Sequence, residues 1–66
     1  MNNTLKVERA KKDITQQDLA EEIGVSRQTI NSIESGKYVP STVLALKIAR
    51  YFEVTVNDIF ELDLED

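Results

Sequence analysis

Between Gln16 and Ser35 the chain carries four polar side chains whose types and spacing suit contact with the edges of nucleic-acid bases. Arg27 and Gln28 are followed about one helical turn later by Asn31 and Ser32, which places all four on one face of a helix. Arg can donate to O6 and N7 of guanine, and Gln can bond N6 and N7 of adenine. A single Arg or Gln on a wet face is usually only a solubilising residue, but the spaced set predicts base contact.

Two short helices joined by a tight turn are needed to hold that face outward. We predict one helix at Gln16–Ile23 and a second from its cap at Ser26 to about Glu34. Gly24 stands where the chain must leave the first helix in a left-handed conformation. The apolar residues of the pair are spaced to pack, and they are Leu19, Ala20, Ile23, Val25, Ile30 and Ile33. The pattern therefore predicts a helix-turn-helix motif over residues 16–35.

Three further helices are predicted around this pair, at about Thr4–Lys12, at Thr42–Phe52 and from the cap Thr55 through Phe60. The fold class is then all-α, with five helices in a single domain that spans residues 1–66. A chain this short buries only about 60% of its unfolded surface. We therefore expect self-association to contribute to its stability.

The C-terminal end of the chain follows a different period. Phe60, Leu62 and Leu64 alternate with acidic residues, which predicts a short β-strand at about residues 61–65. A lone strand is not stable. Its partner must come from the N-terminal residues, from another chain, or from both, and the alternative is a frayed acidic tail.

The net charge of −4 argues at first against a nucleic-acid partner. Residues 1–52, however, hold all eight Lys and Arg against six acidic residues, a net of +2, and the other six acidic residues follow position 52. The local patch that faces the phosphates decides binding. An acidic tail held away from double-stranded DNA is therefore compatible with binding it.

The composition argues against an enzyme. Neither Cys nor His is present, which removes thiolate metal ligands and the commonest general base. Exposed carboxylates such as Glu21 and Glu22 have no cavity-sized chain around them, and there is no Gly-rich phosphate loop. We expect no catalysis, no metal and no cofactor. Without a membrane span or a signal peptide, we expect a soluble cytoplasmic protein that has no small-molecule ligand domain.

Two segments carry a specific family likeness, Ile23–Arg27 (IGVSR) and Ile33–Ser41 (IESGKYVPS). Over roughly Leu5 to Phe60 the chain closely resembles the Xre family of Cro/repressor-like helix-turn-helix proteins. Its length and strand-like end resemble the small dimeric repressors of the cytolysin-repressor type. The resemblance implies a lambda-repressor-like fold of five helices, in which the second and third contact DNA.

The resemblance also implies roles for individual residues. Arg27 and Gln28 match the principal base-contacting positions, and Ser32 matches a third one a turn later. Gln16, at the start of the second helix, matches a position that binds phosphate and can support a base contact. To these we add Asn31, from its place on the same face.

Other matched positions concern the DNA backbone and the frame of the fold. Lys37 and Tyr38 match a loop that contacts the backbone of DNA, and we assign Thr29 to the backbone as well. Arg9 and Glu34 match a pair that forms a buried salt bridge between the first and third helices in lambdoid phage repressors, which implies a structural role here. Family members that form dimers through a strand after the fifth helix imply that Phe60, Leu62 and Leu64 form a dimer interface.

Residue pattern and resemblance together predict a sequence-specific DNA-binding transcriptional regulator. We expect a repressor that binds a near-palindromic operator as a homodimer through its third helix in the major groove. One alternative from a different class is an antitoxin or adaptor that uses the acidic tail to bind a basic partner protein. Co-purification with such a partner, together with no salt-dependent retention on DNA, would favour that alternative.

Overall fold

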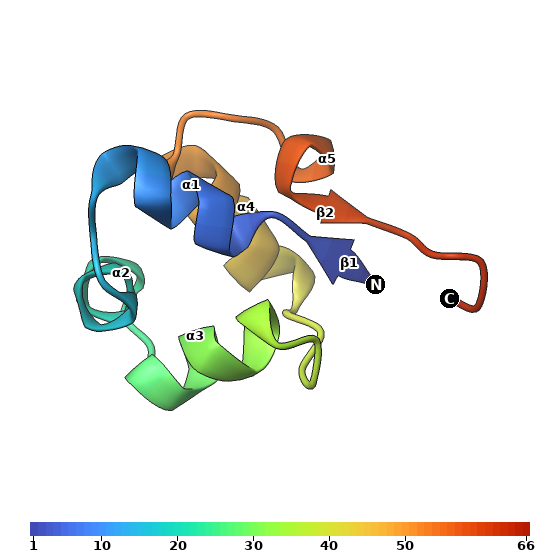
Figure 1. Ribbon diagram of the computed structural model, residues 1–66, viewed down its shortest axis with the longest axis horizontal. Coiled ribbons are helices and arrows are strands. Elements are labelled where there is room, and N and C mark those ends of the chain that lie inside the picture. The colour runs from blue at the N-terminus through green and yellow to red at the C-terminus, as the bar shows by residue number, and fades with distance from the viewer.

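Five helices and two short strands make up the computed structural model, which describes residues 1–66 (Figure 1). In chain order they are β1 (Asn2–Asn3), α1 (Leu5–Lys12), α2 (Gln16–Ile23), α3 (Arg27–Glu34), α4 (Thr42–Tyr51), α5 (Val56–Ile59) and β2 (Phe60–Glu61). The predicted five-helix architecture is confirmed. The longest helix, α4, has 10 residues, and none of the helices is long and apolar enough to cross a membrane.

Side chains that accept hydrogen bonds from free backbone amides fix where the helices begin. The hydroxyl of Ser41 accepts from the amide of Leu44 at 3.1 Å and starts α4. At the start of α5 the carboxylate of Asp58 accepts from the amide of Thr55 at 2.8 Å. The first helix begins at Leu5, whose amide donates to the side chain of Asn3 at 3.1 Å.

Two predicted helix ends are wrong by one residue. The fourth helix ends at Tyr51 because Phe52 serves as its C-cap. The fifth ends at Ile59 because the backbone of Phe60 is already extended, with φ −112° and ψ 136°. In both cases the phenylalanine is a core residue, so packing of the side chain and not helix propensity decides the backbone around it.

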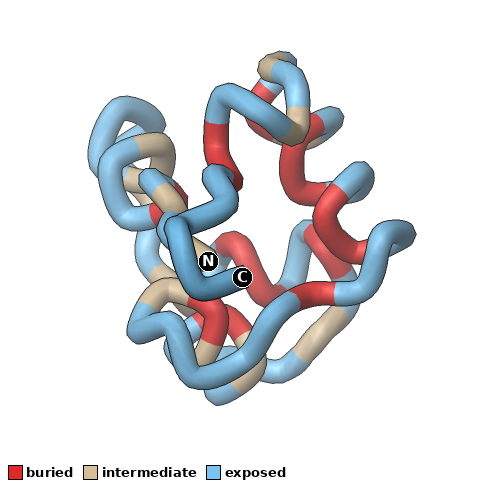
Figure 2. The backbone as a smooth tube through the Cα atoms, turned by 90° about the vertical axis from the view of Figure 1, so that its right-hand side faces the viewer, coloured by how far each residue is buried: buried red, intermediate tan, exposed pale blue.

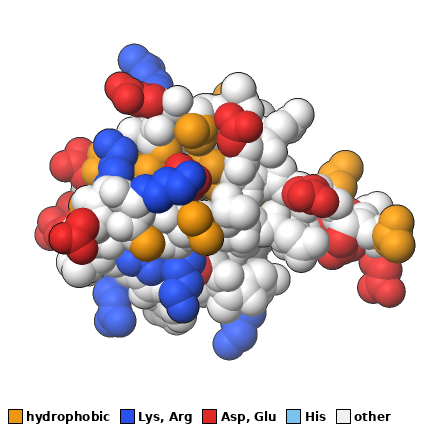
Figure 3. Space-filling view, turned by 45° about the horizontal axis from the view of Figure 1, so that its top comes forward, with side chains coloured by type: hydrophobic (Ala, Val, Ile, Leu, Met, Phe, Trp, Pro, Cys, Tyr) orange, Lys and Arg blue, Asp and Glu red, His pale blue; other side chains and the backbone are white.

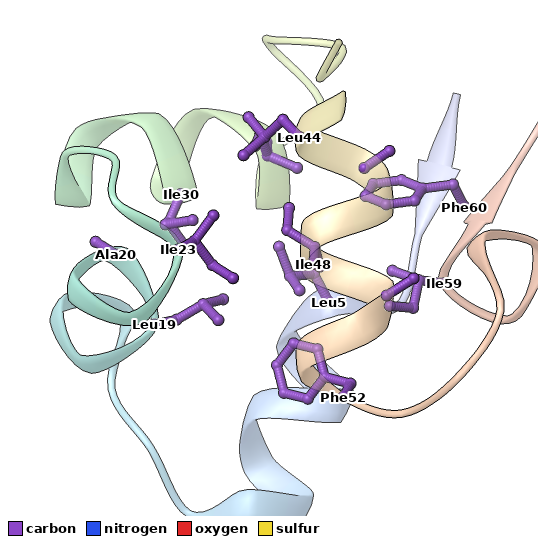
Figure 4. Packing of buried hydrophobic residues seen from close by; sticks show 13 residues of the cluster. Leu5, Leu19, Ala20, Ile23, Ile30, Leu44, Ile48, Phe52, Ile59 and Phe60 are labelled. Carbon is purple, nitrogen blue, oxygen red and sulfur yellow. The ribbon is translucent and has the colours of Figure 1, made fainter. Parts of the chain in front are cut away.

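The core surrounds α4, the helix with buried residues on more than one side. Leu19 and Ile23 of α2 point across the core toward Ile48 of α4, while Ile59 and Phe60 lie on the other side of that helix (Figure 4). In all, 13 apolar residues are buried, and no buried side-chain polar atom lacks a hydrogen-bond partner. Buried stretches recur along the helices, whereas residues 61–66 are exposed throughout (Figure 2).

The two strands pair in an antiparallel sheet within one chain, with Asn2 opposite Glu61 and Asn3 opposite Phe60. The sequence left open which segment pairs with the C-terminal strand, and in the structure this partner is the N-terminal segment of the same chain. The predicted strand at about residues 61–65 is wrong in extent, since pairing begins at Phe60 and ends at Glu61.

The strand stops early because Asp63 forms a competing local turn. Its side chain accepts from the amide of Glu65 at 2.8 Å, and its own amide donates to the carboxylate of Asp66 at 2.9 Å. Asp side chains that bond nearby amides in this way offer the backbone an alternative to a ladder. The N-terminal amine of Met1 adds ion pairs to Asp63 and Asp66, at 3.3 and 2.9 Å, and holds the turn beside β1.

Candidate nucleic-acid interface

Capping residues fix the start of each helix in the α2–α3 pair. The hydroxyl of Thr15 accepts from the amide of Asp18, and the carboxylate of Asp18 accepts from the amide of Thr15, both at 3.0 Å. Ser26 starts α3 by accepting from the amide of Thr29 at 3.1 Å. Between the helices Gly24 adopts φ +86°, a left-handed conformation in which a side chain would be strained. The predicted limits of both helices are confirmed.

The buried apolar residues of α2 and α3 orient α3 so that its polar face points toward solvent. Ile30 and Ile33 are buried against the core, together with Leu19 of α2. Gln28 lies close to half a turn around the helix from both isoleucines, so it faces away from the core. Arg27 and Gln28 are both exposed at the N-terminal end of α3.

Three of the four predicted base-contacting residues line one of two hollows beside α3. On the α2 side Arg27 lines a hollow together with Gln16 and Arg9. On the other side Gln28 and Ser32 line a second hollow with Tyr38. The polar face is thus grooved along both edges of the helix, which leaves its side chains accessible from outside.

The loop after α3 is fastened to that helix. The amides of Lys37 and Tyr38 both donate to the carbonyl of Ser32, at 2.9 and 3.2 Å. Both side chains are exposed after the C-terminal end of α3, and that of Tyr38 lines the second hollow. Thr29 differs from these two, because it is half-buried and its hydroxyl bonds the hydroxyl of Ser26 at 2.9 Å.

A series of side-chain hydrogen bonds connects the Arg9–Glu34 salt bridge to the polar face of α3. The guanidinium of Arg9 donates to both carboxylate oxygens of Glu34, through Nε and, at 3.0 Å, through Nη2. The amide nitrogen of Gln16 donates to Glu34 Oε1 and to Asn31 Oδ1, each at 3.2 Å. The hydrogen bonds to Glu34 raise the pKa of Arg9 above its ordinary value.

The structure therefore brings Arg9, Glu34, Gln16 and Asn31 into one network, of which the sequence indicated only the first pair. The contacts of Gln16 were missed because they cross between two helices. Asn3 was missed too: besides its bond to Leu5, it donates from Nδ2 to the carbonyl of Ile33 at 2.9 Å and fastens β1 to α3. No pattern in the sequence distinguishes such an Asn from an ordinary cap.

Charge is distributed unevenly over the molecule. The C-terminal arm that extends to the right in Figure 3 carries acidic and apolar side chains. All Lys and Arg lie between Lys6 and Arg50, on the body of the protein. In Figure 1 the C-terminal arm extends to the right, away from α2 at the left, so the acidic residues of the arm lie apart from that helix.

A helix pair with these caps, this turn and an outward polar face is the arrangement that helix-turn-helix proteins use. The model of the helix-turn-helix family HTH_3 matches residues 5–59 of the chain. The chain belongs to this family. The resemblance to Xre-type helix-turn-helix proteins is thereby confirmed.

Several related proteins of this family are similar in length to this chain. The chain is 58% identical over 60 residues to an uncharacterized HTH-type transcriptional regulator from Methanocaldococcus jannaschii, covering 91% of each chain. It is 46% identical over 66 residues to the uncharacterized HTH-type transcriptional regulator YgzD from Bacillus subtilis, covering 100% of both. This helix-turn-helix protein is accordingly a transcriptional regulator with a DNA-binding domain, and its family is not one of enzymes.

Solved structures show the same fold. The restriction-modification controller protein C.AhdI from Aeromonas hydrophila superposes with a TM-score of 0.77 at 28% identity, over 85% of this chain and 81% of that one. The SOS-response transcriptional repressor LexA from Eubacterium rectale gives a TM-score of 0.77 at 30% identity, over 94% and 74% of the two chains.

Proposed function

We propose that this helix-turn-helix protein is a sequence-specific repressor that binds a near-palindromic operator as a homodimer, with α3 in the major groove. The observation that carries the proposal is the outward face of α3, where Arg27, Gln28 and Asn31 are exposed and Ser32 is half-buried, on a helix fixed by its cap. The N-terminal part of such a helix is the part that reaches base edges.

The residues divide by the kind of contact they can make. Arg27 and Gln28 carry side chains able to form paired hydrogen bonds to guanine and to adenine. Lys37, Tyr38 and Gln16 lie at the ends of the α3 face, where backbone phosphates would pass, and Thr29 is a weaker candidate because its hydroxyl is engaged with Ser26. Phosphate contacts set the register, and base contacts supply specificity.

A homodimer is supported by exposed apolar side chains of the tail and by the size of an operator site. Leu62 and Leu64 are large aliphatic residues that are 75% and fully exposed. One α3 covers half an operator site, and a two-fold dimer would place a second α3 about 34 Å away in the next major groove. Phe60 no longer belongs to the proposed interface, because its ring is only 6% exposed and packs in its own chain's core. Repression is supported by the likeness to a protein described as a transcriptional repressor.

Substitutions in two different positions test the proposal on one operator. The operator is first selected from a random double-stranded DNA pool at fixed salt, and a symmetric consensus is the expected result. Arg27→Ala should then lose about 1–3 kcal/mol of binding free energy on that operator and relax preference at one position of each half-site. The measurement is a titration on the operator and on its single-base variants.

Lys37→Ala is the matched control, because it removes a positive charge without removing a base contact. It should weaken binding to operator and random DNA alike and reduce the salt slope by about 1. Equal losses on operator and random DNA for Arg27→Ala would show that Arg27 does not contact a base. An asymmetric consensus of a single half-site would contradict the homodimer.

A further inference from the structure

The amide group of Gln16 lies between the largely buried side chain of Glu34 and the polar residue Asn31 of the α3 face. Its nitrogen is 3.2 Å from Glu34 Oε1 and 3.2 Å from Asn31 Oδ1. An NH₂ group has two hydrogens, so it can donate to both oxygens at once. Gln16 therefore joins the buried salt bridge to a residue proposed to contact DNA.

The orientation of these two amides follows from the charge of Glu34. Its side chain is only 7% exposed, and both of its carboxylate oxygens accept hydrogen bonds from Arg9. A carboxylate can only accept. The atom of Gln16 that contacts Glu34 must therefore be the nitrogen, because an oxygen there would face a second acceptor.

The same reasoning fixes the amide of Asn31. The nitrogen of Gln16 is a donor, so the Asn31 atom that faces it must be the acceptor Oδ1. The remaining group, the NH₂ of Asn31, is then turned away from Gln16. Asn31 is exposed on the outer face of α3, where a freely rotating amide would otherwise present either group.

From this geometry we propose that Asn31 presents a hydrogen-bond donor to DNA and determines specificity for guanine, with Gln16 as the residue that positions it. Guanine offers two acceptors, O6 and N7, at its major-groove edge. Adenine requires an amide that donates to N7 and accepts from N6, and the acceptor of Asn31 is engaged with Gln16. This inference rests on the proposed function, namely that α3 contacts bases.

The test compares base preferences of three variants with those of the wild-type protein, each selected from a random DNA pool at fixed salt. Wild type should prefer guanine by at least about fivefold at the operator position that Asn31 contacts. Asn31→Asp keeps an oxygen toward Gln16 and turns the outward group into an acceptor. Preference at that position should move to cytosine, whose N4 amino group donates.

Gln16→Ala removes the positioning contact and leaves Asn31 free to rotate. Adenine should then be accepted about as well as guanine at the same position. Gln17→Ala is the matched control: its side chain belongs to the same helix but bonds only Glu21, at 3.4 Å, so the guanine preference should persist. A merely structural role of Gln16 would lower affinity and leave the base preference unchanged.

A further measurement uses only the wild-type protein, so its result does not depend on whether the variants fold. Replacing the guanine by 7-deazaguanine, which lacks the N7 acceptor, should weaken binding by at least about fivefold, as expected for one lost base contact. An adenine preference in wild type, or an unchanged preference in Asn31→Asp, would overturn the inference while a symmetric operator still supported the proposed function. A pool with no enriched sequence would overturn both.

Discussion

Arg9 supports the proposed DNA-binding surface through its contacts with other residues of the protein. Its guanidinium bonds the carbonyl of Ile14 at 3.0 Å, in the loop between α1 and α2, and both oxygens of Glu34 at the end of α3. With 14% and 7% of their side chains exposed, Arg9 and Glu34 are largely removed from water. A buried pair of this kind adds little net stability, but the loss of one partner leaves an uncompensated charge.

We predict that Glu34→Ala lowers the free energy of unfolding by about 3 kcal/mol, because it leaves the Arg9 guanidinium without a partner in a mostly buried position. The measurement is urea denaturation followed by circular dichroism. The pair Lys11–Glu8, at 3.2 Å, provides the control, since the Lys11 side chain is 68% exposed and Lys11→Ala removes a solvent-accessible ion pair worth at most about 1 kcal/mol. Equal losses for both variants would contradict a special role of the buried pair.

For individual residues, the sequence predicted which types lie on which face of a helix, but it did not predict the hydrogen-bond network between helices. Arg27 and Gln28 were found because a helical period places them opposite the apolar residues, and the structure leaves both exposed. The bonds of Gln16 to Asn31 and Glu34 depend on how two helices cross. That crossing follows from packing of the whole core and cannot be obtained from spacing along one helix.

Among the elements, the helix starts are the part of the fold most directly encoded in the sequence. The limits of α2 and α3 were predicted correctly because Thr15, Gly24 and Ser26 act through short-range hydrogen bonds and backbone geometry. The strand was misplaced because its alternating pattern competes with the turn at Asp63 and finds only Asn2–Asn3 to pair with. Long-range pairing of that kind leaves no local signal.

The acidic caps predict how stability changes with pH. Hydrogen bonds from the backbone and hydroxyl of Thr15 lower the pKa of Asp18, and those of Thr55 lower the pKa of Asp58. Because these pKa values are lower in the folded protein, the stabilisation is present above the ordinary value of 3.8 and is lost as pH falls through the folded values. We expect the melting temperature to fall as the pH drops below about 4.

Removing the two carboxylates should reduce that pH dependence. The double variant Asp18→Asn, Asp58→Asn should melt at a lower temperature than wild type at neutral pH and lose less on acidification. Thermal denaturation across a pH series measures both effects. Glu22→Gln is the control, since Glu22 is an exposed residue of α2 outside the caps and its variant should keep the full pH dependence. An unchanged slope in the double variant would contradict the assignment to the caps.

In the molecule as a whole, the C-terminal arm combines acidic charge with exposed leucines, and the two have different effects. Its charge would weaken non-specific attraction to DNA, while its exposed leucines offer an apolar surface for a second copy. A two-fold interface uses the same patch on both subunits. We predict that Leu62→Glu abolishes dimer formation and lowers operator affinity, with little change in the stability of the monomer fold because Leu62 is 75% exposed.

Sedimentation velocity over a concentration series, with and without operator DNA, measures this effect. Val7→Glu is the matched control, because Val7 is also an exposed aliphatic residue, at 53%, but lies on α1. It should leave self-association unchanged. A Leu62→Glu protein that still sediments as a dimer would place the interface on another surface of the bundle.

The small sheet has a consequence for the order in which the molecule folds. Asn3 pairs with Phe60 from the opposite end of the sequence, and contacts so distant along a chain close later than the local contacts of helices. The same Asn3 side chain fastens the end of α3 through the carbonyl of Ile33. A nascent or briefly opened chain can thus have its helix pair formed while α3 is not yet held in place. We expect competence to bind DNA to arise only when the two chain ends have met, so the slowest folding event and the onset of binding should share one rate constant.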